Sequence, residues 1–539
     1  MELINKTISE CLKERANISG KRTAIEMDGW SCTFEQLDKL SDFLAIQMGR
    51  YGIEKGTHVG IWSVNSPSWV FTFLALTKIG AISVLINTSL KDEEITQILN
   101  YADVEVLYYG AGCQTIIYED LIARIRSKTP KIRHFVHIDG KEAGAWVKED
   151  DFGRKYYSQE ALAELEERKK AIKPADTACM IFTSGTTSFP KGVLLSHYSI
   201  VNNSLAMIKA MHWNDNDKML ITVPMFHCFG VTAGIIACLL SGAEMDLLPY
   251  FKTAAVWDAL EAGNCTVLNG VPSMFLALIR KPEHKDRCAD GLKSGIIAGS
   301  PVTLAEYTEI CSRFPNMHLQ PSYGQSETSP CVTIANWDDP LETKGSSAGK
   351  LIDHVSARIA DKGTGSVLEQ GRDGEIQVKG YNVMLGYYHL PKPTAQAFTS
   401  DGWLKTGDIG HFDKNGRLHV TGRLKEMIIR GGENISPQEI EQVIKKLGWV
   451  EQVKVVGMPV DVLQEEIVAC IIPKQGCEIN KNELMNFLKP RLARYKMPAC
   501  ILGFDTFPVN ACGKVETGKL KLQAETMVKE ESAKKTKTG

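Results

Sequence analysis

Short apolar runs alternate along this chain with longer segments whose apolar residues recur at helical spacing. Thr177–Phe182 is predicted to form a buried strand, Thr183–Lys191 a polar loop and Gly192–Ser196 a second strand. A helix is predicted to follow from about Ser199. Strand runs that alternate with helical segments are typical of α/β architecture, so we expect a large α/β fold.

The most apolar stretch of the chain is Trp69–Ile86, which Lys78 and Gly80 interrupt. It falls short of the roughly 20 clean residues that a membrane-spanning helix needs. We predict a buried helix followed by a buried strand here, and we expect no integral membrane segment. The first residues of the chain are polar and charged, without the apolar centre of a secretory signal.

A second, smaller unit is predicted to begin after Arg423. The glycine pair Gly431-Gly432 is followed by a well-marked helix start, with Ser436 as N-cap, Pro437 at the first helical position and Glu439 at the third. The apolar residues that follow share one helical face: Ile440, Val443, Ile444 and Leu447.

Two strand-like runs, Val453–Val456 and Ile467–Ile472, and a second helix over Lys481–Leu492 complete this unit. We therefore predict an α/β protein with two domains. A large multi-sheet α/β domain spans 1–423, a small mobile α+β domain spans 424–528, and a charged, disordered tail spans 529–539.

Composition narrows the functional classes. A chain of 539 residues exceeds one ordinary core, and 44% hydrophobic with 23% charged residues is typical of a globular protein. The net charge of −2 argues against a nucleic-acid-binding protein, which normally carries a basic excess. Small polyanions such as nucleotides need only a few placed cations.

The fourteen cysteines form no CxxC pair, which argues against a zinc site or a thioredoxin-like centre. They are typical of reduced, mostly buried cysteines in a cytoplasmic protein. Cys512 differs from the others because it lies two residues before Lys514.

The loop Thr183–Gly192 (TSGTTSFPKG) carries the strongest local chemical signal. Backbone N–H groups, hydroxyls and a lysine in a loop between strands can wrap a polyphosphate. Pro190 takes the place of the glycine before the lysine, so this is not a Walker A loop. By composition alone, a plain Ser/Thr/Gly turn is about as well supported. The candidate phosphate-binding residues are Thr183, Ser184, Gly185, Thr186, Thr187 and Lys191.

This loop resembles the phosphate-binding loop of the adenylate-forming superfamily, which contains acyl-CoA synthetases, carrier-loading adenylation domains and luciferase. Other blocks similar to the family's follow in the family's order over nearly the whole chain: Tyr323–Thr328 (YGQSET), Trp403–Asp408 (WLKTGD), Gly422–Glu426 (GRLKE) and Pro508–Lys514. The resemblance implies ATP, Mg²⁺ and coenzyme A as cofactors and cosubstrates, and a small carboxylic acid as substrate.

The resemblance also implies roles at the nucleotide. Tyr323 would stack on adenine, with Gly299, Ser300 and Pro301 closing the other side of the base, and Gly324 belongs to the same block. Ser326 would donate to the α-phosphate and Glu327 would hold Mg²⁺, which prefers a carboxylate and phosphate oxygens. Read without the family, Tyr323 is better explained as a core aromatic, and a solvated carboxylate is the plain alternative for Glu327.

Three further residues match family positions. Asp408 would accept both ribose hydroxyls, a bidentate task suited to a carboxylate. Arg423 would lie beside the ribose and phosphate, although an arginine in a surface ion pair is the plain alternative. His227 would lie near the substrate carboxylate, with a core histidine as its alternative.

Lys514 is the predicted catalytic lysine. A carboxylate that approaches a triphosphate meets repulsion between anions, and a lysine that bridges the two offsets it in the transition state. In the family the small domain rotates after adenylation. Lys425 matches the hinge of that rotation, and Gly432 matches the position that lines the pantetheine tunnel.

Several positions depart from the family's pattern. Ser188 replaces a common glycine, and Asn510-Ala511-Cys512 is less basic than usual. Asn434 replaces a residue that is basic in some relatives, which weakens the expectation for the coenzyme A phosphates.

The choice of acid follows from apolar segments near His227, Val271–Phe275 and Thr328–Val332, which carry no basic residue for a second carboxylate. The predicted substrate is a monocarboxylic, medium-chain fatty acid, with an aryl acid as the alternative. An amino-acid or acyl adenylation enzyme that loads a carrier protein, and a non-catalytic ligand-binding relative, are the remaining alternatives.

Overall fold

A computed structural model describes residues 1–114, 116–138, 158–183, 190–262, 264–430, 433–460, 464–492, 496–510 and 513–537. Contacts divide these residues into two compact units. The first holds the described parts of 1–183, 190–356 and 379–402, and the second holds 357–378 and the described part of 403–537. None of the helices in the described ranges is long and apolar enough to cross a membrane.

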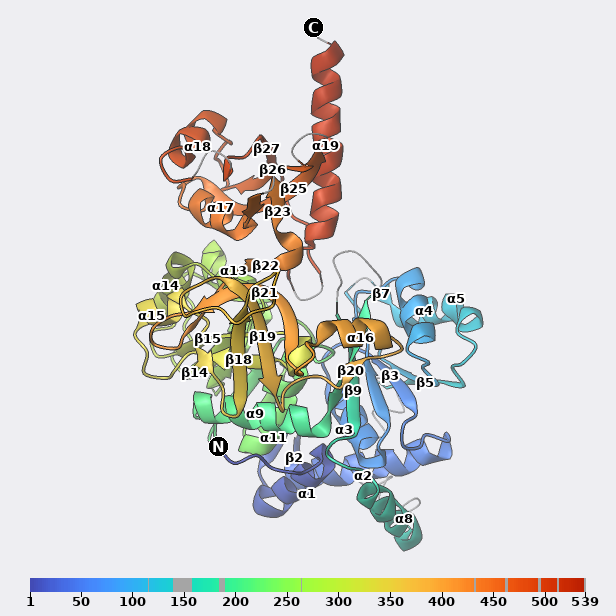
Figure 1. Cartoon of the computed structure of the whole chain (residues 1–539). Coiled ribbons are helices and arrows are strands. Elements are labelled where there is room, and N and C mark those ends of the chain that lie inside the picture. The colour runs from blue at the N-terminus through green and yellow to red at the C-terminus, as the bar shows by residue number, and fades with distance from the viewer. Residues whose placement is uncertain are drawn as a thin grey trace. The chain divides into compact units, whose positions relative to one another are not determined.

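Within the described residues, the first unit is built on two large sheets (Figure 1). The nine-stranded sheet has the order β17 (Lys350–Leu351), β16 (Cys331–Ile334), β15 (His318–Gly324), β14 (Ser294–Ile297), β13 (Val267–Leu268), β11 (Lys218–Ile221), β12 (Glu244–Leu247), β1 (Thr23–Met27) and β2 (Trp30–Thr33). The seven-stranded sheet has the order β20 (Gly386–Tyr387), β10 (Lys191–Ser196), β9 (Thr177–Thr183), β4 (Ile82–Leu85), β3 (His58–Trp62), β5 (Val106–Tyr109) and β8 (His134–His137). A small ribbon pairs β6 (Gly112–Cys113) with β7 (Ile116–Ile117).

The helices of the first unit cover these sheets and connect their strands. They are α1 (Ile8–Ser19), α2 (Phe34–Arg50), α3 (Pro67–Ile79), α4 (Asp92–Tyr101), α5 (Tyr118–Ile125), α8 (Gln159–Lys170), α9 (His197–Met211), α10 (Cys228–Gly230), the π-helix η2 (Val231–Ile236), α11 (Ala237–Ser241), α12 (Thr253–Glu261), α13 (Pro272–Arg280), α14 (Leu304–Arg313), α15 (Leu341–Ser346) and α16 (Pro391–Ala397). Short 3₁₀ turns add η1 (Arg126–Lys128), η3 (Pro282–His284) and η4 (Ser326–Thr328).

Each large sheet has its own apolar core. On the seven-stranded sheet, Trp62 of β3 packs with side chains of α4 and α5, and its ring stacks on Tyr118 with 3.7 Å between centroids. On the nine-stranded sheet, Leu268 of β13 packs with side chains of α12, α13 and α14, Trp257 among them. The predicted helix and strand within Trp69–Ile86 are confirmed as α3 and β4, and α3 is almost wholly buried.

A buried ion cluster ties α2 to α3 and α8. The Lys78 ammonium lies 2.6 Å from Asp38 and 2.7 Å from Asp42, and Lys169 of α8 lies 2.7 Å from Asp42. Each buried charge therefore has a partner, as burial requires.

The second unit, over its described residues, contains two further sheets. A four-stranded sheet has the order β18 (Val355–Ala360), β19 (Gly374–Gly380), β21 (Leu404–Phe412) and β22 (Leu418–Arg423). A five-stranded sheet has the order β24 (Glu433–Ile435), β23 (Ile428–Arg430), β26 (Gln464–Pro473) and β25 (Val450–Val460), with β27 (Cys500–Gly503) also paired to β26. The turn η5 (Leu424–Glu426) joins the two sheets, so the sequence-predicted boundary after Arg423 lies between them.

The five-stranded sheet is covered on both faces by helices of the same unit. Along β25, Val453 and Val455 pack with α17 (Pro437–Ile444) and α18 (Lys481–Leu488), whereas Val456 packs with α19 (Thr517–Lys537). This division follows from the period of two in a strand.

The helix α17 begins at Pro437, as the sequence predicts, but its N-cap works differently. The Ser436 hydroxyl donates to the Thr421 carbonyl at 2.8 Å and accepts no bond from the first turn of the helix. At the end of the chain, α19 continues into the segment 529–539 that the sequence predicts to be disordered. Alanine, lysine and glutamate support a helix there, and no proline interrupts it.

Candidate functional site

The predicted substrate residues of the first unit gather at one edge of the nine-stranded sheet. The neighbouring strands β11, β13, β14 and β15 are parallel. His227 follows β11, Gly299–Pro301 follow β14, and Tyr323 and Gly324 end β15. The carboxyl ends of parallel strands meet at one edge, which is where open α/β sheets bind ligands.

Two glycines at this edge have backbone conformations or surroundings that exclude a side chain. Gly299 has φ = +88°, in the left-handed region that favours glycine. A Cβ atom on Gly324 would lie 1.7 Å from the Pro330 carbonyl oxygen. Both positions of the predicted adenine site therefore depend on glycine, and Tyr323 lies half-buried beside Gly324.

His227 caps the helix that starts after β11. Its Nδ1 accepts a hydrogen bond from the Phe229 N–H at 3.2 Å. The neutral imidazole therefore carries its proton on Nε2 and can donate from that nitrogen. The π-helix η2 follows within the same helical run, and such π-turns are frequent at functional sites.

Cys228 connects His227 to the next predicted residue. Its sulfur lies 3.5 Å from His227 Nδ1 and 3.7 Å from the Ser326 hydroxyl, and it is fully buried. Ser326 is buried too, at the start of η4. The histidine of one loop and the serine of another are thus brought together by a cysteine that the sequence did not single out.

The predicted metal ligand Glu327 and the lysine of the phosphate loop contact the same tyrosine, Tyr387. The Tyr387 hydroxyl donates to Glu327 Oε1 at 2.9 Å, and the Lys191 ammonium lies 4.4 Å from the centre of the Tyr387 ring. Desolvation, and then the Glu327 carboxylate, raises the pKa of Tyr387, so the phenol keeps its proton. Sequence reasoning assigned no role to Tyr387.

Thr183 and Lys191 flank the phosphate loop on the paired strands β9 and β10. The Thr183 hydroxyl donates to the Lys191 carbonyl at 3.5 Å. Ser184, Gly185, Thr186 and Thr187 lie outside the described residues.

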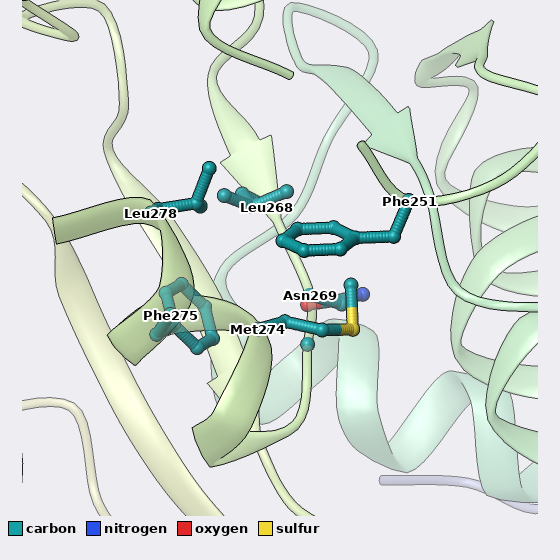
Figure 2. A pocket seen from close by; sticks show the side chains of 7 residues that line it. Phe251, Leu268, Asn269, Met274, Phe275 and Leu278 are labelled. Atoms are coloured by element: carbon teal, nitrogen blue, oxygen red, sulfur yellow. The ribbon is translucent and has the colours of Figure 1, made fainter. Parts of the chain in front are cut away.

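A narrow apolar gap, too small to hold a water molecule, lies in the core beside β13, between that strand and α13. Figure 2 shows the side chains of Phe251, Leu268, Met274, Phe275 and Leu278 surrounding the space. Asn269 also lines the gap, and its amide is engaged inside the fold. Its nitrogen donates to the Ala233 carbonyl at 3.2 Å, and its oxygen accepts from the Ile296 N–H at 2.9 Å. The lining therefore offers an apolar surface.

In the second unit, the predicted ribose ligand is already held in place. Asp408 of β21 pairs in register with Arg423 of β22. The Arg423 Nε lies 2.7 Å from Asp408 Oδ1, and Asp408 is buried. The structure thus joins two residues for which the sequence predicts a common ligand, and fixes the rotamer of the carboxylate.

Lys514 stands on a tight turn of the same unit. Its N–H donates to the Asn510 side chain at 3.0 Å, and its carbonyl accepts from the Asn510 N–H at 2.8 Å. Gly513, with φ = +75°, permits the turn. Although Lys514 is accessible to solvent, desolvation by the surrounding protein, and then the charge of Arg423, lowers its pKa to about 8. Glu426 and Asp408 act in the opposite direction.

Lys425 lies in the turn η5, between the two sheets of the second unit. Gly432 lies outside the described residues.

Sequence families match both parts of the chain. A model described as AMP-binding enzyme matches residues 12–388, and a model described as AMP-binding enzyme C-terminal domain matches residues 439–514. The first match alone spans more than half of the 539 residues.

Individual relatives cover almost the whole chain. A protein of Bacillus subtilis (strain 168) named putative acyl-CoA synthetase YngI is 34% identical over 96% of this chain and 97% of its own length. Human medium-chain acyl-CoA ligase ACSF2, mitochondrial, is 31% identical over 97% of this chain and 88% of its own.

Among solved structures, ATP-bound MatB from Rhodopseudomonas palustris superposes with a TM-score of 0.84 at 25% identity, covering 96% of this chain and 99% of that one. Its bound ATP agrees with the nucleotide chemistry that the resemblance implied. The chain belongs to the AMP-binding enzyme family, among its acyl-CoA synthetases and ligases.

Proposed function

We propose that this enzyme converts a hydrophobic monocarboxylic acid, ATP and coenzyme A to acyl-CoA, AMP and diphosphate. The observation that carries the proposal is a cluster built from both large sheets of the first unit, where His227, Ser326, Glu327 and Lys191 are linked through Cys228 and Tyr387. A proton donor, a hydroxyl, a carboxylate and a cation in one place suit an acid meeting a polyphosphate.

In the first half-reaction, a carboxylate oxygen of the acid attacks the α-phosphorus. The bond from that phosphorus to the bridging oxygen breaks, and diphosphate leaves with the electron pair. His227 donates from Nε2 to orient the substrate carboxylate, and Ser326 donates to the α-phosphate. Lys514 stabilises the charge that gathers on the α-phosphate oxygens.

The residues of the nucleotide site take the family's roles. Tyr323 stacks on adenine, with Gly299, Ser300, Pro301 and Gly324 shaping the site, and Asp408 accepts from the ribose hydroxyls beside Arg423. Thr183 through Thr187 and Lys191 hold the β- and γ-phosphates.

Glu327 suits a magnesium ion because its half-buried carboxylate is held by a phenol beside the phosphate-loop lysine. Bound Mg²⁺ would neutralise phosphate charge. The Tyr387 hydrogen bond orients this carboxylate.

In the second half-reaction, the thiol sulfur of coenzyme A attacks the acyl carbon. The carbon–oxygen bond to AMP breaks, AMP leaves, and the thiol proton passes to solvent. We propose that the domain 424–528 rotates at Lys425 between the steps, relative to the domain 1–423. Lys514 then leaves the site, and Gly432 lines the pantetheine channel.

For the acid, we propose a medium-chain fatty acid. The segments near His227, Val271–Phe275 and Thr328–Val332 are largely apolar and carry no basic residue. A second carboxylate would find no cation there, which disfavours diacids. The human relative is named a medium-chain acyl-CoA ligase. An aryl acid is the second candidate.

A cytoplasmic location belongs to the same proposal. All thirteen cysteines in the described part of the chain are free, as expected in a reducing compartment.

The test is a panel of acids of graded length, from acetate to stearate, with benzoate and a dicarboxylate added. Diphosphate release and thioester formation are measured with and without coenzyme A. We expect both to peak at a medium chain and the thioester to require coenzyme A. Adenylate formation without any thioester would favour a carrier-loading enzyme, and a preference for benzoate would favour the aryl-acid candidate.

A further inference from the structure

The short strand β20 joins two parts of the site that are far apart in sequence. It pairs with β10, the strand that begins at Lys191. Just before it, the Met384 N–H donates to the Glu327 carbonyl at 2.9 Å, and just after it, the Tyr388 N–H donates to the Gly192 carbonyl at 2.8 Å. One segment is thus fixed by its backbone to both the metal-ligand turn and the phosphate-loop strand.

The side chain of Tyr387 also connects the two parts of the site, because it contacts a charged group in each. Its hydroxyl donates to Glu327 Oε1 at 2.9 Å, and the Lys191 ammonium lies over its ring, 4.4 Å from the ring centroid. Within the described part of the chain, Lys191 forms no ion pair, so this ring is its electrostatic contact.

Both charges contact the same side chain, so an ion pair between them is the alternative arrangement. A Lys191–Glu327 ion pair would turn the lysine away from phosphate and occupy the carboxylate that suits a metal ion. Tyr387 offers each charge a weaker contact instead. A ring face and a neutral hydroxyl can both give way to a ligand at less cost than an ion pair.

We propose that Tyr387 is a positioning residue, which orients Glu327 for Mg²⁺ and keeps Lys191 from pairing with it, so that both charges serve Mg²⁺·ATP. This inference rests on the proposed function, because it assigns the nucleotide and the metal to the same site.

The neighbouring tyrosine supplies a matched control. Tyr388 also donates its hydroxyl to a carboxylate, Asp103, at 2.8 Å. Asp103 is held in addition by Lys131 and by His389. Tyr387→Phe and Tyr388→Phe therefore remove the same chemical group and the same kind of hydrogen bond, but only the first removes it from Glu327.

The experiment measures ATP binding to the full-length protein by calorimetry, with Mg²⁺ and with EDTA. The ratio of the two affinities reports how strongly metal and nucleotide support each other. In Tyr387→Phe we expect this ratio to fall about tenfold, the scale of one hydrogen bond to a charged group, while the affinity in EDTA changes little. Tyr388→Phe should keep the ratio of the parent protein.

Tyr387→Leu removes the ring as well, so Lys191 can pair with Glu327. We expect ATP binding in EDTA to weaken in this variant too, which a loss of the hydroxyl alone does not produce. An unchanged ratio in Tyr387→Phe, or an equal fall in Tyr388→Phe, overturns the role of Tyr387. A parent protein that binds ATP equally with and without Mg²⁺ overturns the metal assignment within the proposed function.

Discussion

We expect the lowered pKa of Lys514 to make the proposed first half-reaction sensitive to alkaline pH. Protein desolvation and the nearby Arg423 charge bring this pKa to about 8, well below that of an ordinary lysine. The ammonium is the form that can stabilise phosphate charge. Below pH 8 most molecules carry it, and at pH 9 only about a tenth do, since each pH unit changes the ratio tenfold.

We therefore expect kcat/KM for ATP to be level near neutral pH and to fall about tenfold per unit above pH 8. The assay is acid-dependent exchange of labelled diphosphate into ATP, which follows adenylation alone. Fatty acids are fully ionised in this range, so the substrate contributes no change of its own. Because bound triphosphate raises the pKa of a nearby ammonium, kcat should fall at higher pH than kcat/KM.

Two variants separate Lys514 from other titrating groups. Lys514→Arg keeps its charge at every pH of the assay, so its lower activity should show no fall near pH 8. Lys514→Ala should lose at least about 10²-fold of exchange activity, yet still form thioester from supplied acyl-AMP. The reasoning is refuted if the parent profile stays level to about pH 10, or if the arginine variant falls at the same pH.

Two further predictions concern binding and stability. Asp408→Ala should raise the KM for ATP by about tenfold and lower kcat less, because ribose contacts are made in ground and transition states alike. The control is Asp373→Ala, since Asp373 is a carboxylate near the same sheet that contacts His411; this variant should change neither KM nor kcat. Lys78→Met leaves Asp38 and Asp42 buried with one cation fewer, so urea unfolding should show a loss of about 3 kcal/mol. The control is Lys13→Met, because Lys13 is an exposed partner of Asp38; this variant should lower the free energy of unfolding by less than about 1 kcal/mol. Equal losses in Lys78→Met and Lys13→Met would contradict the argument that burial makes the Lys78 pairs important.

Local sequence patterns predict the elements whose physics is local. The start of α17 at Pro437 is confirmed, because proline fixes φ and lacks the N–H that a first turn leaves unbonded. The two-faced burial of β25 follows from the period of a strand. Local patterns could not predict the hydrogen bond from Ser436 to Thr421, because it depends on β22 lying beside the start of the helix.

The site shows the same division more sharply. Family blocks led to Glu327 and Lys191, but neither composition nor spacing distinguishes Tyr387 from Tyr388. Tyr387 ends the strand β20 and Tyr388 follows it, and successive residues along extended chain point to opposite sides. Which of them faces Glu327 is decided by the register in which β20 pairs with β10, a contact between segments about 190 residues apart.

The grouping of the four-stranded sheet with the C-terminal residues is likewise a non-local property. Its strands come from two separated segments, 355–380 and 404–423, and no local sequence pattern predicts that these segments pair. The turn η5, which joins this sheet to the next, is by contrast visible as a change in sequence pattern. It is also where the proposed rotation can be tested.

Lys425→Pro tests that rotation. A residue at a hinge must visit two combinations of φ and ψ, whereas proline fixes φ near −65° and disfavours helical geometry at Leu424 before it. We expect the variant to keep diphosphate exchange and to lose most thioester formation, even from supplied acyl-AMP. Lys425→Ala, which removes the side chain but leaves the backbone free, should keep both steps.

The comparison between these two variants carries the argument. If Lys425 is an ordinary loop residue, proline should leave both half-reactions intact or lower both together with thermal stability. Only a joint that must move lets a single backbone restriction separate two reactions catalysed by one chain. A folded proline variant with equal activity in both steps would remove the hinge from Lys425 and leave the family membership untouched.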